Sequence, residues 1–342
     1  MPPESYFELE AEKQRRMLEA LIAETGQRGE NLEKDIWVCQ TLDILFNLPC
    51  KKPMAFKGGT SLSKVYKAIQ RFSEDVDITV NYKSLGVDVP DLATLDTNKK
   101  RKDIRESLQD ALNRHVEQEL VPEFKEALTS KFPNLQWSMD VEGEKVYLRY
   151  PTVYASDNPY VRPQVFIEFG GRNDTLPQET VQIHCDVAAH VPNVAFPIAH
   201  VPVLSPQRTF WEKVTLIHVE CQRPDFRANT SRLFRHWYDV DLLSSHGVGK
   251  AALLDKGLLE DVIKIKRAFF FAAYSNYDYC LDGRLKLIPG DELLKELRAD
   301  HQKMIDAQMF HGDAAPADFD KIIGRLHALE NTINQNHSAK PV

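Results

Sequence analysis

Asp75 and Asp77 are the two residues whose type and spacing best suit catalytic chemistry. In an extended segment, side chains two positions apart leave the same face of the strand. Two adjacent carboxylates repel each other unless a cation lies between them. Oxygen ligands of this kind suit Mg²⁺, which keeps several of its waters and bridges to substrate phosphates. The pair therefore predicts a magnesium site; the alternative is a solvated pair of acids at a strand edge.

A turn of small residues, Gly58-Gly59-Thr60-Ser61, precedes this pair and opens a helix predicted over 60–70. Glycine permits a tight turn and a close approach of the backbone to a ligand. The start of a helix presents free N–H groups and a positive dipole end to a phosphate, and two hydroxyls add donors. A simple N-cap explains the turn alone, but its position one helix before Asp-x-Asp favours a triphosphate site.

Glu168 lies in an otherwise apolar segment, 164–169, and supplies a third candidate carboxylate. A lone buried carboxylate is unfavourable unless it is paired or binds a metal. We therefore predict that Glu168 is a metal ligand or a general base, and the alternative is a salt bridge with Arg172.

The C-terminal part offers further polar candidates on predicted helices. Lys213 flanks the apolar stripe of the helix predicted over 208–221, where a stem packed on the core with its ammonium in water would also explain it. Arg235 and Asp239 share one face of the helix predicted over 230–244. That face is either a self-paired surface or the wall of a cleft that meets a triphosphate.

Two more cations, Lys64 and Arg71, are weaker candidates for contact with a nucleotide. For Arg71 the alternative is an ion pair with Glu74. A basic run, Lys99 to Arg105, is either a solvated start of a helix or a nucleic-acid contact.

The predicted elements indicate an α+β region over residues 1–205 followed by an all-helical region over 206–342. The boundary is predicted in the proline-rich segment 186–207, which reads as turns. The segment 102–129 is predicted as one long helix with a kink at Pro122.

Composition limits the function classes. The net charge of −7 excludes nucleic-acid binding through bulk positive charge, so any RNA contact must be a local patch. Five separated cysteines without a CxxC pair indicate neither a disulfide framework nor a zinc ribbon. No segment reaches 18 apolar residues, and the first residues lack the pattern of a signal peptide, so the expected location is cytoplasmic without a membrane contact.

The combination of motifs resembles a known family. A glycine pair, a helix and then Asp-x-Asp are typical of nucleotidyltransferases similar to DNA polymerase β. The fuller forms resemble the AbiEii/AbiGii toxin family, and they lie at residues 56–64 (Phe-Lys-Gly-Gly-Thr-Ser-Leu-Ser-Lys), 71–78 (Arg-Phe-Ser-Glu-Asp-Val-Asp-Ile), 209–214 (Thr-Phe-Trp-Glu-Lys-Val) and 235–240 (Arg-His-Trp-Tyr-Asp-Val). The resemblance spans almost the whole chain.

The resemblance implies a polymerase β-like domain, a mixed sheet flanked by helices, followed by a helical domain that completes the cleft. It implies that Gly59 and Ser61 contact a triphosphate, that Lys213 contacts phosphate and that Asp239 is a catalytic acid. Asp75 and Asp77 would bind metal, and Glu168 is a looser match.

The function implied is the Mg²⁺-dependent transfer of a nucleotide from an NTP to RNA, with the acceptor end of tRNA as the expected site. Such proteins resemble the toxins of bacterial toxin–antitoxin or phage-defence systems, so a cognate antitoxin is an expected partner. The alternatives are nucleotidylation of a protein hydroxyl and a non-catalytic protein that binds nucleotide or antitoxin.

Overall fold

The computed structural model describes residues 3–71, 73, 75–154, 162–224, 231–307, 309–310 and 318–338. The chain divides into two compact units. Unit 1 consists of Met1–Val65, Ser73–Val87 and Ser107–Val203. Unit 2 consists of Tyr66–Phe72, Asp88–Glu106 and Leu204–Val342. The chain therefore enters unit 2 twice before its last and longest segment.

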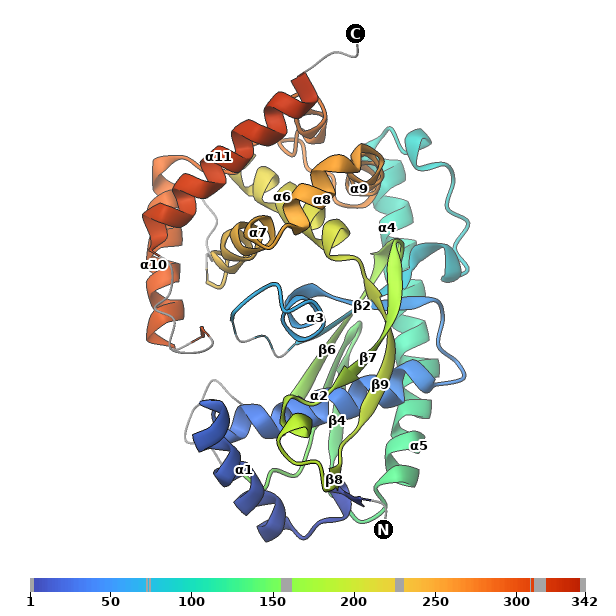
Figure 1. The fold of residues 1–342 in the computed structure, drawn as a ribbon. Helices are drawn as coiled ribbons and strands as arrows, with labels where there is room; N and C mark the ends of the chain where they lie inside the picture. The colour runs from blue at the N-terminus through green and yellow to red at the C-terminus, as the bar shows by residue number, and fades with distance from the viewer. Residues whose placement is uncertain are drawn as a thin grey trace. The chain divides into compact units, whose positions relative to one another are not determined.

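Within the described part of unit 1, seven strands form one mixed sheet in the order β4-β5-β6-β3-β2-β9-β7 (Figure 1). β3 is antiparallel to β2 and parallel to β6, and β4, β5 and β6 form an antiparallel meander. A separate parallel pair joins β1 to β8. The strands are β1 (Glu4–Ser5), β2 (Met54–Lys57), β3 (Val76–Asn81), β4 (Ser138–Glu142), β5 (Lys145–Arg149), β6 (Gln164–Asn173), β7 (Gln178–His184), β8 (Val194–Ala195) and β9 (Ile198–Leu204).

The helix α2 (Gly29–Asn47) is the central helix of unit 1, and Figure 1 shows it lying across the sheet. Apolar side chains on nearly every face of this helix are buried, including Ile36, Leu42 and Leu45. This is expected of a helix inside a core. The helix contacts β6 and α5. The other helical elements of unit 1, apart from the run over 98–131, are η1 (Tyr6–Glu8), α1 (Ala11–Thr25), α3 (Gly58–Lys64), η2 (Tyr82–Ser84) and η5 (Asp186–Ala189).

The long helix predicted over 102–129 is a helical run with a local irregularity. It consists of α4 (Asn98–Arg114), the π-helical segment η4 (His115–Leu120) and α5 (Val121–Lys131). Pro122 lies at the start of α5. Proline has no N–H and clashes with the carbonyl four residues earlier. The wider π-helical turn before it accommodates both effects and keeps the run helical.

The turn-rich reading of 186–207 is wrong in part, because the segment contains η5, β8 and β9. The buried positions Ala199, Val201 and Val203 alternate with more exposed ones, which is the period of a strand. Pro202 falls at one of the alternate, half-buried positions. The prolines predicted turns, but the alternation of buried and exposed residues is that of the strand β9.

Unit 2 is built around α6 (Pro206–Gln222), which contacts three neighbouring helices, α7, α8 and α9. Trp211 and Trp237 fill its core, and their indole N–H groups donate to Ala252 O at 3.3 Å and to Leu287 O at 2.8 Å. The other helices are η3 (Leu92–Thr94), α7 (Arg235–Ser245), α8 (Val248–Leu254), α9 (Lys256–Phe269), η6 (Tyr277–Cys280), α10 (Asp291–Asp306) and α11 (Phe319–Ser338).

Candidate active site

The carboxylate of Asp77 lies against Gly58 in the predicted site. Gly58 begins α3 directly after β2, and its backbone lies in the left-handed region with φ of 82°. A Cβ added to Gly58 would lie 2.0 Å from Oδ2 of Asp77 and 2.8 Å from its Cγ. Glycine is therefore required twice, once for the backbone conformation and once because the carboxylate of Asp77 fills the space of a side chain.

The hydroxyls of the glycine turn are bonded within the chain. Thr60 Oγ1 donates to the main-chain oxygen of Asp75 at 2.6 Å and lies 3.0 Å from Ser73 Oγ. Ser61 Oγ donates to Gly58 O at 3.0 Å. Thr60, Ser61 and Gly59 are all buried. Thr60 thus ties the turn to the segment that leads into β3, and the predicted contacts of both hydroxyls with a triphosphate stay predictions.

Asp75 lies immediately before β3 and is half-buried. Its main-chain oxygen accepts the hydrogen bond from Thr60. Its carboxylate makes no hydrogen bond or ion pair with the residues that the structure describes, so it is available to a ligand.

A row of five charged side chains crosses the sheet at the level of Asp77. The strand registers pair Asp77 with Lys57 on β2 and with Glu168 on β6. Glu168 pairs in turn with Lys145 on β5, and Lys145 pairs with Glu142 on β4. Residues paired in register project from the same face of a sheet, on strands about 4.8 Å apart. Two adjacent acids, Asp77 and Glu168, therefore lie between two lysines.

The sequence argument for Glu168 was partly wrong. We expected a buried carboxylate, but Glu168 is exposed, because the buried residues Val165, Ile167 and Phe169 occupy the alternate positions of β6. Its carboxylate has no hydrogen bond or ion pair with the described residues, so the alternative of a salt bridge with Arg172 is not seen. Its place beside Asp77 comes from the strand register and not from burial.

A second group of residues that could bind a metal lies in unit 1 and includes two cysteine thiols. Within the described chain, ligand atoms of Asp35, Cys39 and Cys185 lie within 4.8 Å of one another, whereas those of Asp75, Asp77 and Glu168 do not form such a set. The hydrogen bond with Cys39, and burial, raise the pKa of the Cys185 thiol well above its ordinary value. A protonated thiol is a poor metal ligand, so this cluster does not fit a metal as it stands.

Lys64 already supplies the positive charge in that cluster. Its ammonium pairs with Asp35 and lies 3.5 Å from Asp186 Oδ1, and its side chain is 5% exposed. Burial alone would lower the pKa of Lys64, but Asp35 raises it well above the ordinary value. The geometry gives Lys64 an internal partner, and its predicted contact with a nucleotide stays a prediction.

Asp239, on α7 of unit 2, is the centre of a buried ion-pair network. Arg71 binds it with both ends of the guanidinium, through Nε to Oδ1 at 2.7 Å and Nη2 to Oδ2 at 2.8 Å. Lys213 Nζ lies 3.0 Å from Oδ2. Burial would raise the pKa of Asp239, but Arg71 and then Lys213 lower it far below its ordinary value. Because Asp239 is fully buried, a solvated self-paired face does not describe it.

More than one cation surrounds the single carboxylate of Asp239, and their charges act on the neighbouring side chains. Burial lowers the pKa of Lys213 below its ordinary value, with the attraction of Asp239 opposing that change. Burial, followed by the charges of Lys213 and Arg235, lowers the pKa of His236 well below its ordinary value. The alternative partner for Arg71 that the sequence suggested, Glu74, lies outside the described residues.

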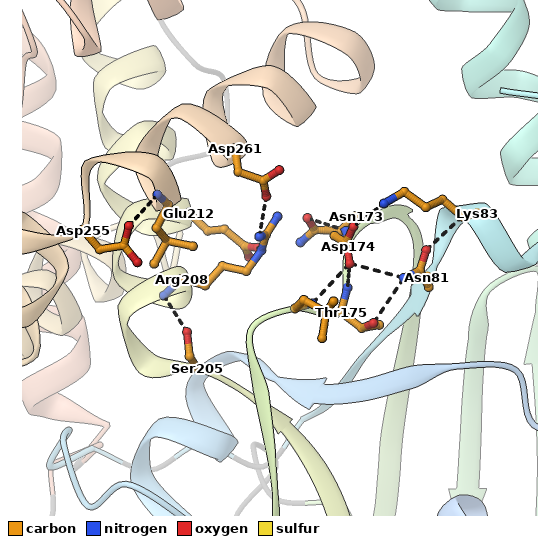
Figure 2. Close-up of polar contacts among 12 residues, drawn as sticks. Asn81, Lys83, Asn173, Asp174, Thr175, Ser205, Arg208, Glu212, Asp255 and Asp261 are labelled. Carbon is orange, nitrogen blue, oxygen red and sulfur yellow. Dashed lines mark hydrogen bonds and ion pairs between the residues drawn. The ribbon is translucent and has the colours of Figure 1, made fainter. Parts of the chain in front are cut away.

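Two further polar clusters were not identified from the sequence, and each lies within one unit (Figure 2). In unit 1, Asp174 accepts from Lys83 Nζ at 2.9 Å and from the main-chain N–H of Thr175 at 2.7 Å, which joins the end of β6 to the chain after β3. In unit 2, buried Arg208 donates to Asp261 Oδ2 at 2.7 Å and lies 3.4 Å from Glu212. The signal that could have found Arg208 is its position immediately before the motif at residues 209–214.

The mixed sheet, with the glycine turn against Asp77 and Glu168 beside it, is the arrangement expected of a nucleotidyltransferase similar to DNA polymerase β. The chain belongs to the family of the nucleotidyl transferase AbiEii toxin of type IV toxin–antitoxin systems, which matches residues 42–325. It is thus a nucleotidyltransferase of a toxin family.

Among solved structures, the chain resembles MenT4, the nucleotidyltransferase toxin Rv2826c from Mycobacterium tuberculosis H37Rv. The two are 16% identical, and the match covers 93% of this chain and 99% of that one with a TM-score of 0.40. A likeness at this level carries no argument about the site. No curated protein matches the chain. None of the described helices has the length and apolarity needed to cross a membrane.

Proposed function

We propose that this protein transfers a nucleotide from a magnesium-bound NTP to RNA, with tRNA as the expected acceptor. The observation that carries the proposal is the contact between Gly58 and the Asp77 carboxylate. It brings an acid against the turn where a triphosphate is expected to lie. The register partner of Asp77, Glu168, adds a second carboxylate on the same face of the sheet.

The oxygen donors of this face fit Mg²⁺ and not a soft metal. Asp75, Asp77 and Glu168 supply carboxylates alone, and the carboxylates of Asp75 and Glu168 have no partner among the described residues. We propose that these three hold the ion. When bound, Mg²⁺ would neutralise charge that develops on the transferring phosphoryl group and on the leaving oxygen.

The reaction proposed is an in-line displacement at the α-phosphorus of the NTP. An RNA hydroxyl forms the new P–O bond and gives its proton to Glu168 as general base or to solvent, the bond to the β-phosphate bridging oxygen breaks, and pyrophosphate leaves. Gly58 and Gly59 let the main chain approach the triphosphate, and the carboxylate face fixes the direction from which the hydroxyl arrives. Positioning and charge neutralisation supply most of the acceleration in such reactions. Contacts of Lys213, Arg235 and Arg71 with phosphate, and a catalytic role of Asp239, remain part of the proposal.

The experiment is an incubation of the protein with each α-labelled NTP, Mg²⁺ and total RNA, followed by a denaturing gel. We expect label in a tRNA-sized band that is lost when EDTA removes the metal. Label in a protein band instead would support the alternative of protein nucleotidylation. No label with any NTP would contradict the proposal.

Asp77→Asn is the matching substitution. It keeps the shape of the side chain and removes the charge, so we expect the transfer rate to fall by about 10³-fold or more, equivalent to about 4 kcal/mol of barrier. Asp140→Asn is the control, because Asp140 is an exposed acid on β4 of the same sheet. Normal transfer by a folded Asp77→Asn protein would exclude the assigned site.

The family also implies an antitoxin partner, and growth inhibition by the toxin should depend on the same acids. We expect Asp75→Ala to abolish growth inhibition when the protein is expressed. Inhibition that survives this change in folded protein would instead favour a non-catalytic protein that binds nucleotide or antitoxin.

A further inference from the structure

The start of α4, in unit 2, carries an unusual concentration of cations. No acidic residue lies in the first turn of this helix to offset them. The positive end of the helix dipole is at the N-terminus, so cations there are unfavourable for the helix itself. They suit an anion that arrives from outside. The cations are Lys99, Lys100, Arg101, Lys102 and Arg105.

Internal ion pairs account for few of these charges. Lys100 lies 2.9 Å from Asp96, and Lys102 lies 3.7 Å from Glu106, and all four side chains are more than half exposed. Exposed pairs of this kind contribute little to stability. Lys99 and Arg105 make no ion pair or side-chain hydrogen bond with the described residues. The segment therefore keeps positive charge that its own neighbours do not neutralise.

Exposed aromatic rings lie beside this basic segment. Arg101 places its guanidinium carbon 4.2 Å from the centroid of the Phe271 ring. Phe270 and Phe271 follow α9 and keep 39% and 37% of their surface exposed. Lys266 Nζ lies 4.5 Å from the Phe270 centroid. Two large apolar rings exposed among cations are not explained by packing within the chain.

A second feature concerns Arg101 itself. Its Nε is buried and has no hydrogen-bond partner among the described residues. The guanidinium carbon lies over one face of the Phe271 ring, so a planar cation and an aromatic ring offer flat surfaces at the same place. Flat surfaces of this kind stack on the bases of unpaired nucleotides.

We infer that this surface, defined as Lys99, Arg101, Arg105, Phe270 and Phe271, binds RNA. The cations contact backbone phosphates, and the rings stack on unpaired bases. Because the chain carries a net charge of −7, attraction of RNA has to be local, and this segment supplies it. The inference rests on the proposed function for the identity of the anion, since the function requires an RNA acceptor. It would explain how an acidic protein holds one.

Charge reversal tests the cations directly. The probe is a fluorescent tRNA transcript, and its binding is measured by anisotropy over a range of salt concentrations. We expect Lys99→Glu with Arg105→Glu to weaken binding by about tenfold or more at low salt and to reduce the slope of log Kd against log salt by about one unit or more. The matched control is Lys250→Glu with Lys295→Glu, which changes the net charge equally at exposed positions of α8 and α10. Equal weakening by both pairs would overturn the inference.

Replacement of the rings tests stacking separately. Phe270→Ala with Phe271→Ala should weaken binding of the same tRNA by roughly tenfold with little change in the salt slope, because stacking is not electrostatic. Unchanged tRNA binding by this folded variant would show that Phe270 and Phe271 are not part of the RNA-binding surface. Phosphatidylserine vesicles are the comparison probe. Loss of vesicle binding with intact tRNA binding in the charge-reversed variant would assign the surface to a membrane and contradict the inference.

The inference and the proposed function fail in different ways. If RNA is labelled but the charge-reversed variant binds tRNA normally, the function stands and this surface is not the RNA site. If no RNA is labelled, while the wild-type protein binds tRNA through Lys99 and Arg105, the surface stands and the proposed acceptor is wrong.

Discussion

At the scale of single residues, the site depends on the packing of one carboxylate against one glycine. The sequence predicted Asp77 from its spacing with Asp75, and predicted Gly58 from its place in a turn. It could not predict that the carboxylate occupies the space of the missing Cβ, because that contact depends on how β2 pairs with β3. The glycine and the acid therefore act as a pair, and a change in one should disturb the other.

Gly58→Ala should lower the transfer rate by about 10²-fold while leaving the protein folded. The added methyl would meet Asp77 Oδ2 and displace the carboxylate, and a misplacement of about 1 Å can lower a rate by about 10²-fold. Gly86→Ala is the matched control: Gly86 also has positive φ, but a Cβ there meets nothing within 4 Å. Backbone strain should cost each variant about 1–2 kcal/mol of unfolding free energy, and Gly58→Ala should lose more because its methyl group also meets the side chain of Asp77. Equal transfer rates of the two variants would show that the contact with Asp77 has no part in the reaction.

His236 gives a second prediction at this scale, in the pH dependence of stability. It is half-buried beside Lys213, Arg235, Arg71 and Asp239, and desolvation and the neighbouring cations hold its pKa in the folded protein well below the ordinary value near 6.5. As pH falls below about 6.5, the unfolded chain takes up a proton that the folded protein does not, so the free energy of unfolding decreases.

We therefore expect His236→Gln to reduce this loss by up to about 1.4 kcal/mol per pH unit below 6.5. The measurement is denaturant unfolding at pH 7.5, 6.5 and 5.5. His327, exposed on α11, is the control, and the same substitution there should leave the pH dependence unchanged. Identical pH profiles for His236→Gln and the unaltered protein would contradict the prediction.

At the scale of elements, the sequence predicted the central strands of the sheet but not the side-chain contacts between distant elements. The extended segment of Asp75 and Asp77 and the apolar segment 164–169 correspond to β3 and β6, and the third candidate acid, Glu168, is the register partner of Asp77. The partner of Asp239 was not predictable, because Arg71 is 168 residues away in the chain. Local periodicity reports which face of a helix is apolar, but a buried ion pair is visible only when two distant elements are packed.

The ion-pair network on α7 should be essential to unit 2. Asp239→Ala leaves Arg71 and Lys213 buried without their carboxylate, so we expect a loss of about 3–5 kcal/mol of unfolding free energy. Asp241 is the control: it is equally buried on the same helix, but its partner Arg325 is 46% exposed in its side chain and can turn to water. Asp241→Ala should therefore be clearly less destabilising. Denaturant unfolding of both variants measures the difference, and a larger loss for Asp241→Ala would refute the account of Asp239.

At the scale of the whole molecule, the chain is not a simple series of two domains. The sequence placed a boundary at 205/206, and the last segment of unit 2 does begin at Leu204. Unit 2 also takes Tyr66–Phe72 and Asp88–Glu106 from within the N-terminal region. Composition and proline content locate a change between regions, but they carry no information about a segment that leaves one unit and returns.

The last segment of unit 2 should therefore not fold without the two earlier ones. A fragment of residues 204–342 lacks Arg71, which holds Asp239 and forms a strand-like bridge with Phe310. It also lacks Asp91, which lies 3.3 Å from Lys264 Nζ on α9.

We expect this fragment to show helical circular dichroism without a cooperative thermal transition, since a buried carboxylate that has lost both hydrogen bonds from Arg71 and an uncovered core oppose a single packed state. The comparison is the full chain, which should unfold cooperatively, and the full chain with Arg71→Met, which should lose the stability of unit 2. A fragment that melts as sharply as the full chain would show that unit 2 is complete from Leu204 onward, and that the two excursions of the chain add little to it.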